Sequence, residues 1–200
     1  MASSMEATRL LSGLLDQIRA CSHCAAHLPG GVRPVVQAGE RARVLIIGQA
    51  PGSKVHASGI AWDDDSGDRL RGWLGFDKAR FYDPQAVALM PMGFCYPGKG
   101  KGGDLPPRPE CKPLWHAPLL AALPDLRLTL LVGQYAITAY LPRELRPSLT
   151  DAVRQHADMP EGQLALPHPA WRSRMWMQRN PWFEVETLPL LRERVAAAFG

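Results

Sequence analysis

The run of aliphatic residues from Val44 to Ile47 constrains the fold most strongly, because a turn rich in glycine and proline, Gly48 to Gly52, follows it at once. A short apolar run that stops at a glycine is typical of a strand buried on both faces of a parallel sheet. Ligands bind at the carboxyl edge of such sheets. A phosphate-binding P-loop is excluded, because three residues rather than four separate the two glycines. We therefore expect a ligand site of another kind at this strand end.

The rest of the chain alternates between strand and helix patterns. Further apolar runs predict strands at 86–90, 128–132 and 164–166, and helical spacing predicts helices at 7–20, 68–75, 114–123, from 134 onward and at 188–199. We expect Ser66 or Asp68 to cap the second of these helices. The alternation predicts an α/β fold, a three-layer α/β/α arrangement with a central four-stranded parallel sheet. The 200 residues contain no repeat or linker, which favours a single domain over 1–200.

The charge and the termini bound the environment of the protein. A net charge of +4 and a sequence pI near 9.0 permit a nucleic-acid partner without requiring one. Neither a membrane-spanning apolar stretch nor a signal-peptide pattern is found in the sequence, so we expect a cytoplasmic protein. In that reducing compartment, the four cysteines are expected to bind a metal or to pack as small apolar residues rather than to form disulfides.

The cysteines form two pairs in loop-like segments. Two residues separate Cys21 from Cys24, and fifteen separate Cys95 from Cys111. Four thiolates suit either a tetrahedral zinc ion or an iron–sulfur cluster, and the spacing does not choose between them. The alternative is that Cys95 is merely a buried apolar residue at a strand end, but this leaves the tight first pair unexplained.

Several segments, taken together in order, give the chain a specific resemblance. They are the four-cysteine pattern, Gly48-Gln49-Ala50-Pro51-Gly52, Gly59-Ile60-Ala61-Trp62, Pro106-Pro107-Arg108-Pro109-Glu110-Cys111, Leu130-Leu131-Val132-Gly133 and Leu166-Pro167-His168-Pro169. The chain resembles the uracil-DNA glycosylase superfamily over nearly its whole length, and most closely the iron–sulfur branches, families 4 and 5. The resemblance implies a 4Fe-4S cluster on Cys21, Cys24, Cys95 and Cys111, with zinc as the second choice. It also implies that the base is bound by Gly48, Gln49, Ala50, Pro51, Trp62 and Met92, with Trp62 stacking on it.

The reaction implied by this resemblance needs a water aimed at the sugar and a donor to the departing base. We assign the donor role to His168, held between two prolines, although a lone histidine is often structural. Family 4 has a glutamate where this chain has Gln49, which orients a water but accepts no proton. Asp64, in a position like that of a family 5 aspartate, is therefore our candidate for positioning the water, with Asp63 next. The alternative role for these aspartates is to cap the following helix.

Two further departures bear on specificity. The family 4 asparagine that reads the edge of uracil is missing, and Met92 stands in its segment; Ala170 and Ser173 replace residues often found after the histidine. The leading hypothesis is a monofunctional DNA glycosylase that hydrolyses the N-glycosidic bond of uracil or a related damaged base, with water as the nucleophile. The alternative is a non-catalytic iron–sulfur protein of the same fold that binds nucleic acid.

DNA contact is expected from two segments that carry positive charge. Lys99 and Lys101 lie in a glycine-rich loop suited to phosphates, although a solvated turn would look the same. Beyond His168, the candidates for DNA contact are Trp171, Arg172 and Arg174. We expect the protein to act on DNA as a monomer.

Overall fold

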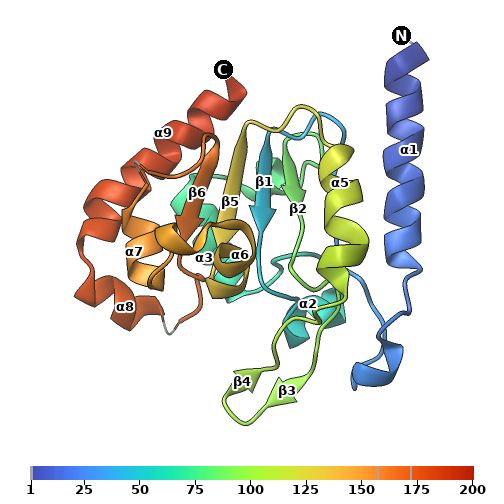
Figure 1. Ribbon diagram of the computed structural model, residues 1–200, viewed down its shortest axis with the longest axis horizontal. Coiled ribbons are helices and arrows are strands. Elements are labelled where there is room, and N and C mark those ends of the chain that lie inside the picture. Colours follow the sequence, from blue (N-terminus) through green and yellow to red (C-terminus); the bar gives the residue numbers. More distant parts are fainter. Residues whose placement is uncertain (1, 157, 172) are drawn as a thin grey trace.

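The central sheet confirms the predicted fold class. The structure, a computed structural model, describes residues 2–156, 158–171 and 173–200. Within these residues the main sheet has four parallel strands in the order β2-β1-β5-β6 (Figure 1). The strands are β1 (Val44–Ile47), β2 (Val87–Leu89), β5 (Leu128–Val132) and β6 (Gln163–Leu166). The aliphatic run before the Gly48 turn is thus an inner strand, and all of its residues are buried.

Helices cover both faces of the sheet. The longer helices are α1 (Ala2–Arg19), α3 (Asp65–Leu74), α6 (Gln134–Tyr140), α8 (Ser173–Arg179) and α9 (Leu188–Phe199). The shorter ones are α2 (Ser53–Ser58), α4 (Lys78–Phe81), α5 (Ala117–Ala121) and α7 (Leu149–Arg154). The helical segments of the described chain also include two 3-10 helices, Ala25–His27 and Arg143–Leu145. There are two π-helical segments as well, Lys112–His116 and Phe183–Thr187.

Alternate residues of β1 face two separate cores. Val44 and Ile46 pack with α3, α4 and α9, whereas Leu45 and Ile47 pack with α1, α5 and α6. This division follows from the alternation of side chains along a strand. Both faces are therefore apolar, which explains why β1 reads as an uninterrupted aliphatic run rather than as an alternating one.

Two helix predictions differ from the structure. The helix expected at 68–75 begins at Asp65, and its N-cap is Asp64 rather than Ser66 or Asp68. Aspartate and serine are both good N-cap residues, so the sequence alone allowed several equally good first residues for this helix. The helix expected at 114–123 starts as a π turn before α5. Pro118 has no N–H to donate four residues back, which disfavours a regular α-helical turn at this point.

The carboxyl edge of the sheet is closed by loops. The stretch 95–113 contains a small hairpin of β3 (Lys99–Gly100) and β4 (Gly103–Asp104), which projects near α2 beyond the carboxyl ends of the strands (Figure 1). Gly48, Gly133 and Pro167 each follow directly on a strand at this edge. A search of the described residues finds no helix with the length and apolar character to span a membrane.

Candidate active site

A cavity of about 490 Å³ opens at the carboxyl edge of the sheet. Its lining comes from the turn after β1, the start of α3, the hairpin and the loop after β6. It includes every residue of the turn Gly48 to Gly52, as the sequence predicted for a ligand site at this strand end. The cavity therefore lies where open α/β sheets bind their ligands.

The Trp62 side chain forms part of the cavity wall and lies against Gly48. A β-carbon added at Gly48 would lie 2.7 Å from Cζ2 of Trp62. A side chain at position 48 would therefore displace the indole. This close approach gives a physical reason for the first glycine of the turn.

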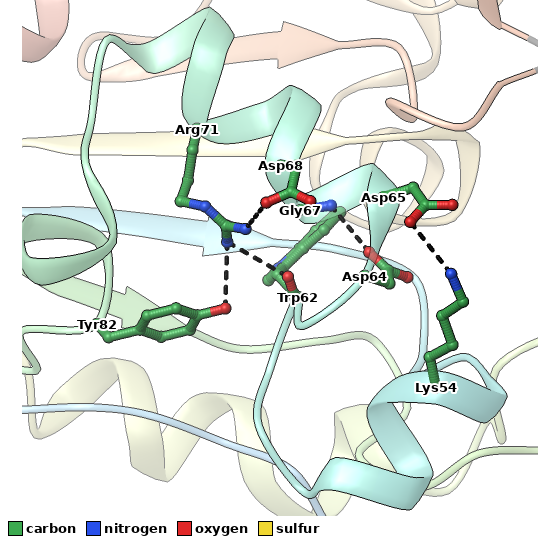
Figure 2. A network of polar contacts seen from close by, with 8 residues as sticks. All are labelled: Lys54, Trp62, Asp64, Asp65, Gly67, Asp68, Arg71 and Tyr82. Carbon is green, nitrogen blue, oxygen red and sulfur yellow. Dashed lines mark hydrogen bonds and ion pairs between the residues drawn. The ribbon is translucent and has the colours of Figure 1, made fainter.

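Trp62 has an unusual backbone conformation, with a φ of 58°. Non-glycine residues in this left-handed region are strained by about 1–3 kcal/mol and are retained where neighbours hold them. Figure 2 shows two of these neighbours: Arg71 Nη1 donates to the Trp62 carbonyl oxygen at 3.3 Å, and Gly67 lies beside the same carbonyl. A β-carbon at Gly67 would lie 1.7 Å from that oxygen. Trp62 is thus fixed by α3.

Arg71 is almost fully buried, with 5% of its surface exposed. It pairs with Asp68 and donates to the Tyr82 hydroxyl at 3.1 Å (Figure 2). Its guanidinium also lies over the rings of Phe81 and Tyr82. A buried charge is tolerated when it is paired and hydrogen-bonded in this way. The network fastens the backbone of the Trp62 loop to the interior.

His168 packs against the Trp62 indole. The two rings stack with centroids 5.6 Å apart and an angle of 26° between their planes. Burial lowers the pKa of His168 to about 4, although the Asp64 carboxylate opposes this effect. At neutral pH the imidazole is therefore uncharged, so one ring nitrogen carries a proton that it can donate and the other can accept. The Ser173 hydroxyl donates to the His168 carbonyl oxygen.

Asp64 lines the cavity and caps α3 at the same time. Its Oδ1 accepts a hydrogen bond from the Gly67 N–H at 2.8 Å (Figure 2). Asp64 therefore has the capping role considered for these aspartates in the sequence, and it also faces the cavity. Asp63, the second choice, is not among the cavity-lining residues. Burial is the main reason that the pKa of Tyr82 is raised, and the Asp63 charge adds to it, which places Asp63 on the Tyr82 side.

Gln49 also faces the cavity, close to His168. A β-carbon at Gly133 would lie 3.2 Å from Cβ of His168 and 3.6 Å from Cγ of Gln49, so these two side chains flank the same point. The structure thus brings three of the four residues predicted for catalysis, Gln49, Asp64 and His168, to one cavity.

The role of Met92 in base binding stays a prediction, and its backbone N–H donates to the Gly48 carbonyl at 3.0 Å. Its side chain packs against the core beside α1 and α5 and is not among the cavity-lining residues. Along the segment that continues β2, Leu89 and Pro91 line the cavity, and Met90 packs in the same core as Met92. The period-two alternation of an extended chain therefore turns the Met92 side chain towards the core rather than the cavity.

The second wall of the cavity was not predicted from the sequence. Asp104 and Leu105 line it from the hairpin, and Tyr135 lines it from the start of α6. Tyr135 comes two residues after Gly133, so the glycine that ends β5 was the available signal. The Asp104 carboxylate accepts a hydrogen bond from the Tyr96 hydroxyl at 3.3 Å.

The described residues among those predicted to contact DNA are exposed. Trp171 lines the cavity while 72% of its surface is exposed. Lys99 and Lys101 are exposed on the hairpin, and Arg174 is exposed on α8. Arg172 lies outside the described residues.

Comparison with known proteins decides the family. Residues 36–192 match the profile of the uracil DNA glycosylase superfamily. The chain belongs to this superfamily. A solution NMR structure from Methanosarcina acetivorans, of a protein that carries the provisional name uracil DNA glycosylase, is also similar. The two are 16% identical, with a TM-score of 0.46, and the match covers 80% of this chain and 98% of that one.

The cysteines lie only partly within the segment that matches the superfamily. Cys21 and Cys24 precede it, and Cys95 and Cys111 are inside it. All four line a second, smaller pocket next to Phe94 and Trp115. None is in a disulfide. In the described part of the chain, no group of three or more His, Cys, Asp or Glu side chains has the arrangement of a metal-ion site.

The chemistry of this cysteine pocket is that of buried thiols. Burial raises the pKa of Cys111 to about 11 and raises that of Cys95, and the neighbouring cysteines add to both effects. Backbone hydrogen bonds oppose this rise in pKa: the backbone of Phe94 binds the Cys111 sulfur, and the backbone of Arg33 binds the Cys95 sulfur. Such bonds stabilise thiolates and are typical of sulfur atoms that bind a cofactor.

Proposed function

We propose that this protein is a monofunctional DNA glycosylase that hydrolyses the N-glycosidic bond of uracil or a related damaged base, with water as the nucleophile. The observation that supports the proposal best is the convergence of neutral His168, Asp64 and Gln49 on one cavity, in a member of the uracil DNA glycosylase superfamily. Enzymes that act on a base in DNA extrude it into such a pocket. The volume of about 490 Å³ is that of a small-molecule site.

The chain supplies a group for each part of the reaction. The C1′–N bond breaks with its electron pair on the base, and the N–H of neutral His168 stabilises the negative charge that develops on a base carbonyl oxygen. The oxygen of a water bonds to C1′, and a proton from that water passes to the Asp64 carboxylate. Gln49 orients the water beside His168, because an amide both donates and accepts hydrogen bonds. The Trp62 indole provides a face on which the extruded base stacks.

DNA is the proposed partner, bound by the protein as a monomer. Exposed lysines on the hairpin, Lys99 and Lys101, and Arg174 on α8 carry the positive charge that phosphates require. The exposed Trp171 at the cavity opening offers a face for an unpaired base. These contacts bind the DNA backbone and the neighbouring bases, while the cavity takes the target base.

We further propose that Cys21, Cys24, Cys95 and Cys111 hold a 4Fe-4S cluster, with zinc as the second choice. The shared pocket and the backbone hydrogen bonds to two of the sulfur atoms fit such a group. When bound, the cluster would serve as a structural tie between the end of α1 and the loops that flank the hairpin. The cysteine pocket and the cavity share no lining residue, so no catalytic step is assigned to the cluster.

The test is base release from a panel of oligonucleotides. Each carries one modified base, such as uracil, hypoxanthine, xanthine or 5-hydroxyuracil, and is offered single-stranded and paired. We expect release of uracil or another base of this panel, and no release by His168→Ala. If the parent binds every substrate and releases no base, the alternative applies: a non-catalytic nucleic-acid-binding protein of the same fold, as the exchange of a carboxylate for Gln49 would favour.

A further inference from the structure

One arginine side chain joins the two loops that carry the proposed catalytic groups. Arg69, on α3, donates from Nη1 to the carbonyl oxygens of Pro169 and Ala170, at 2.9 and 2.7 Å. Both carbonyls belong to the loop that begins at His168, about a hundred residues further along the chain. The same helix has Asp64 as its N-cap. Arg69 thus ties the helix that starts at Asp64 to the loop that starts at His168.

The His168 loop has few means of holding its own shape. Pro167 and Pro169 flank the histidine, and neither has a backbone N–H to donate. One backbone bond within the loop runs from the Ser173 N–H to the Ala170 carbonyl, at 3.0 Å. Side chains supply further bonds: the Ser173 hydroxyl binds the carbonyl of His168 itself, and Arg69 binds the next two carbonyls. Since Arg69 is half-buried, its two bonds are partly protected from competing water.

We propose that Arg69 is a positioning residue, which holds the His168 loop closed so that the imidazole stays packed against Trp62 within reach of Asp64. The role of this contact in catalysis rests on the proposed function, whereas its role in placing His168 does not. Arg69 is not among the cavity-lining residues, so it acts on the reaction through His168 rather than by touching the base.

The protonation of His168 reports on this placement. Its pKa is lowered to about 4 because the ring is buried, and the nearby groups are the Asp64 carboxylate, the Trp62 indole and the uncharged Gln49. If the loop opens, water reaches the ring and the pKa moves back towards its ordinary value of about 6.5. A side chain that merely stabilised the fold would leave the pKa unchanged, as long as the protein stays folded.

The experiment is an NMR titration of the histidine ring signals, with that of His168 assigned by its loss in His168→Ala. We expect the parent His168 to remain neutral at pH 5.5. In Arg69→Met we expect its pKa to rise by about two pH units, towards the ordinary value of about 6.5, so that the ring is largely protonated at pH 5.5. Arg69→Lys separates charge from hydrogen bonding, because it keeps the positive charge but its amine lies one bond closer to the backbone. In Arg69→Lys we expect the pKa of His168 to rise as well.

Arg192 offers a matched control. It donates from Nε to the Trp73 carbonyl at 3.2 Å and from Nη2 to the Gly72 carbonyl at 3.1 Å, so it also bridges to the backbone, but at the other end of α3. Arg192→Met should leave the His168 titration as in the parent. A parent-like titration in both Arg69 variants would overturn the proposal, and so would an equal shift in Arg192→Met.

Excision kinetics then test the catalytic consequence. We expect Arg69→Met to lower the single-turnover rate about tenfold, to keep its affinity for DNA within a factor of two, and to move the acid limb of the pH–rate profile upward. If the parent releases no base, the proposed function fails, but the titration still decides whether Arg69 positions His168. If Arg69→Met does not fold, Arg69→Lys carries the same test.

Discussion

The two walls of the cavity are built in different ways. One wall, formed by the start of α3 and the His168 loop, is tied by side-chain bonds from Asp64, Arg71 and Arg69. The Arg69 bonds join parts of the chain about a hundred residues apart. The other wall is the hairpin, where Gly102, Gly103 and Asp104 are exposed. Hydrogen bonds within the hairpin join residues close in the chain, such as that from the Leu105 N–H to the Gly98 carbonyl.

This difference separates two roles. The groups proposed for chemistry lie on the tied wall, where a small displacement would cost rate. The lysines proposed for phosphate contact lie on the hairpin, whose exposed loop can adapt to DNA. The difference predicts that changes to the tied wall affect excision and changes to the hairpin affect binding.

The largest expected effect is on the tied wall itself. Asp64→Asn removes the charge that orients the water, so single-turnover excision should fall about a hundred- to a thousandfold, with DNA binding retained. Asp63→Asn is the matched control, because Asp63 is a neighbouring carboxylate that does not line the cavity. A parent-like rate in Asp64→Asn together with a crippled Gln49→Ala would assign the water to Gln49 instead.

The contact between Gly48 and Trp62 gives the next prediction. Gly48→Ala places a β-carbon 2.7 Å from the indole, so the protein should lose about 1–3 kcal/mol of unfolding free energy. Chemical denaturation measures this loss. Trp62→Phe provides a smaller ring and should recover part of the stability in the double variant. Independent, additive effects of the two changes would contradict the contact.

The cysteine pocket tests the attachment of the hairpin wall. Cys95 and Cys111 flank the hairpin in the chain, so a cofactor bound to both would anchor its two ends. Protein purified without oxygen should be brown, with iron and sulfide in matching amounts. Cys111→Ser should lose the cofactor and weaken DNA binding more than it slows excision of bound substrate. A colourless protein with stoichiometric zinc would show that the four cysteines hold zinc, the second choice, rather than an iron–sulfur cluster.

The smallest effect is expected at the hairpin lysines. Replacing Lys99 and Lys101 with Ala should weaken binding of all DNA sequences alike, since phosphate contacts carry no base information. The slope of log affinity against log salt should become shallower by about 0.7–0.9 for each phosphate that is no longer bound. Fluorescence anisotropy over a salt series measures this slope, with Lys78→Ala on α4 as a control. An unchanged affinity at low salt would remove the hairpin from the DNA interface.

The spacing of apolar residues along the chain made much of the fold predictable. The strand at 128–132 and the helix at 188–199 were predicted with the bounds that the structure shows, because their apolar positions face a core. The start of α3 was placed three residues too late because several neighbouring residues cap equally well, although capping by Asp64 was among the alternatives. For Met92, the motif position fixed its place in the chain but not which face of the segment its side chain occupies.

The side-chain hydrogen bonds that hold the site together could not be predicted from the sequence. Arg69 and Arg71 lie two positions apart on one helix, yet one binds the loop after β6 and the other binds the carbonyl of Trp62. These contacts depend on how distant segments meet, for which local pattern gives no signal. Asp64 and His168 were found because their residue types and neighbours suggest chemistry by themselves.

The position of β1 in the sheet has a consequence for the protein during its synthesis. β1 pairs with β2 on one side and with β5 on the other, and 85 residues separate Ile47 from the end of β5. At translation rates of about 5–20 residues per second, roughly 4–17 s pass before that second partner has been made. During this interval an aliphatic strand keeps an unpaired edge, which offers its backbone groups to pairing with another chain.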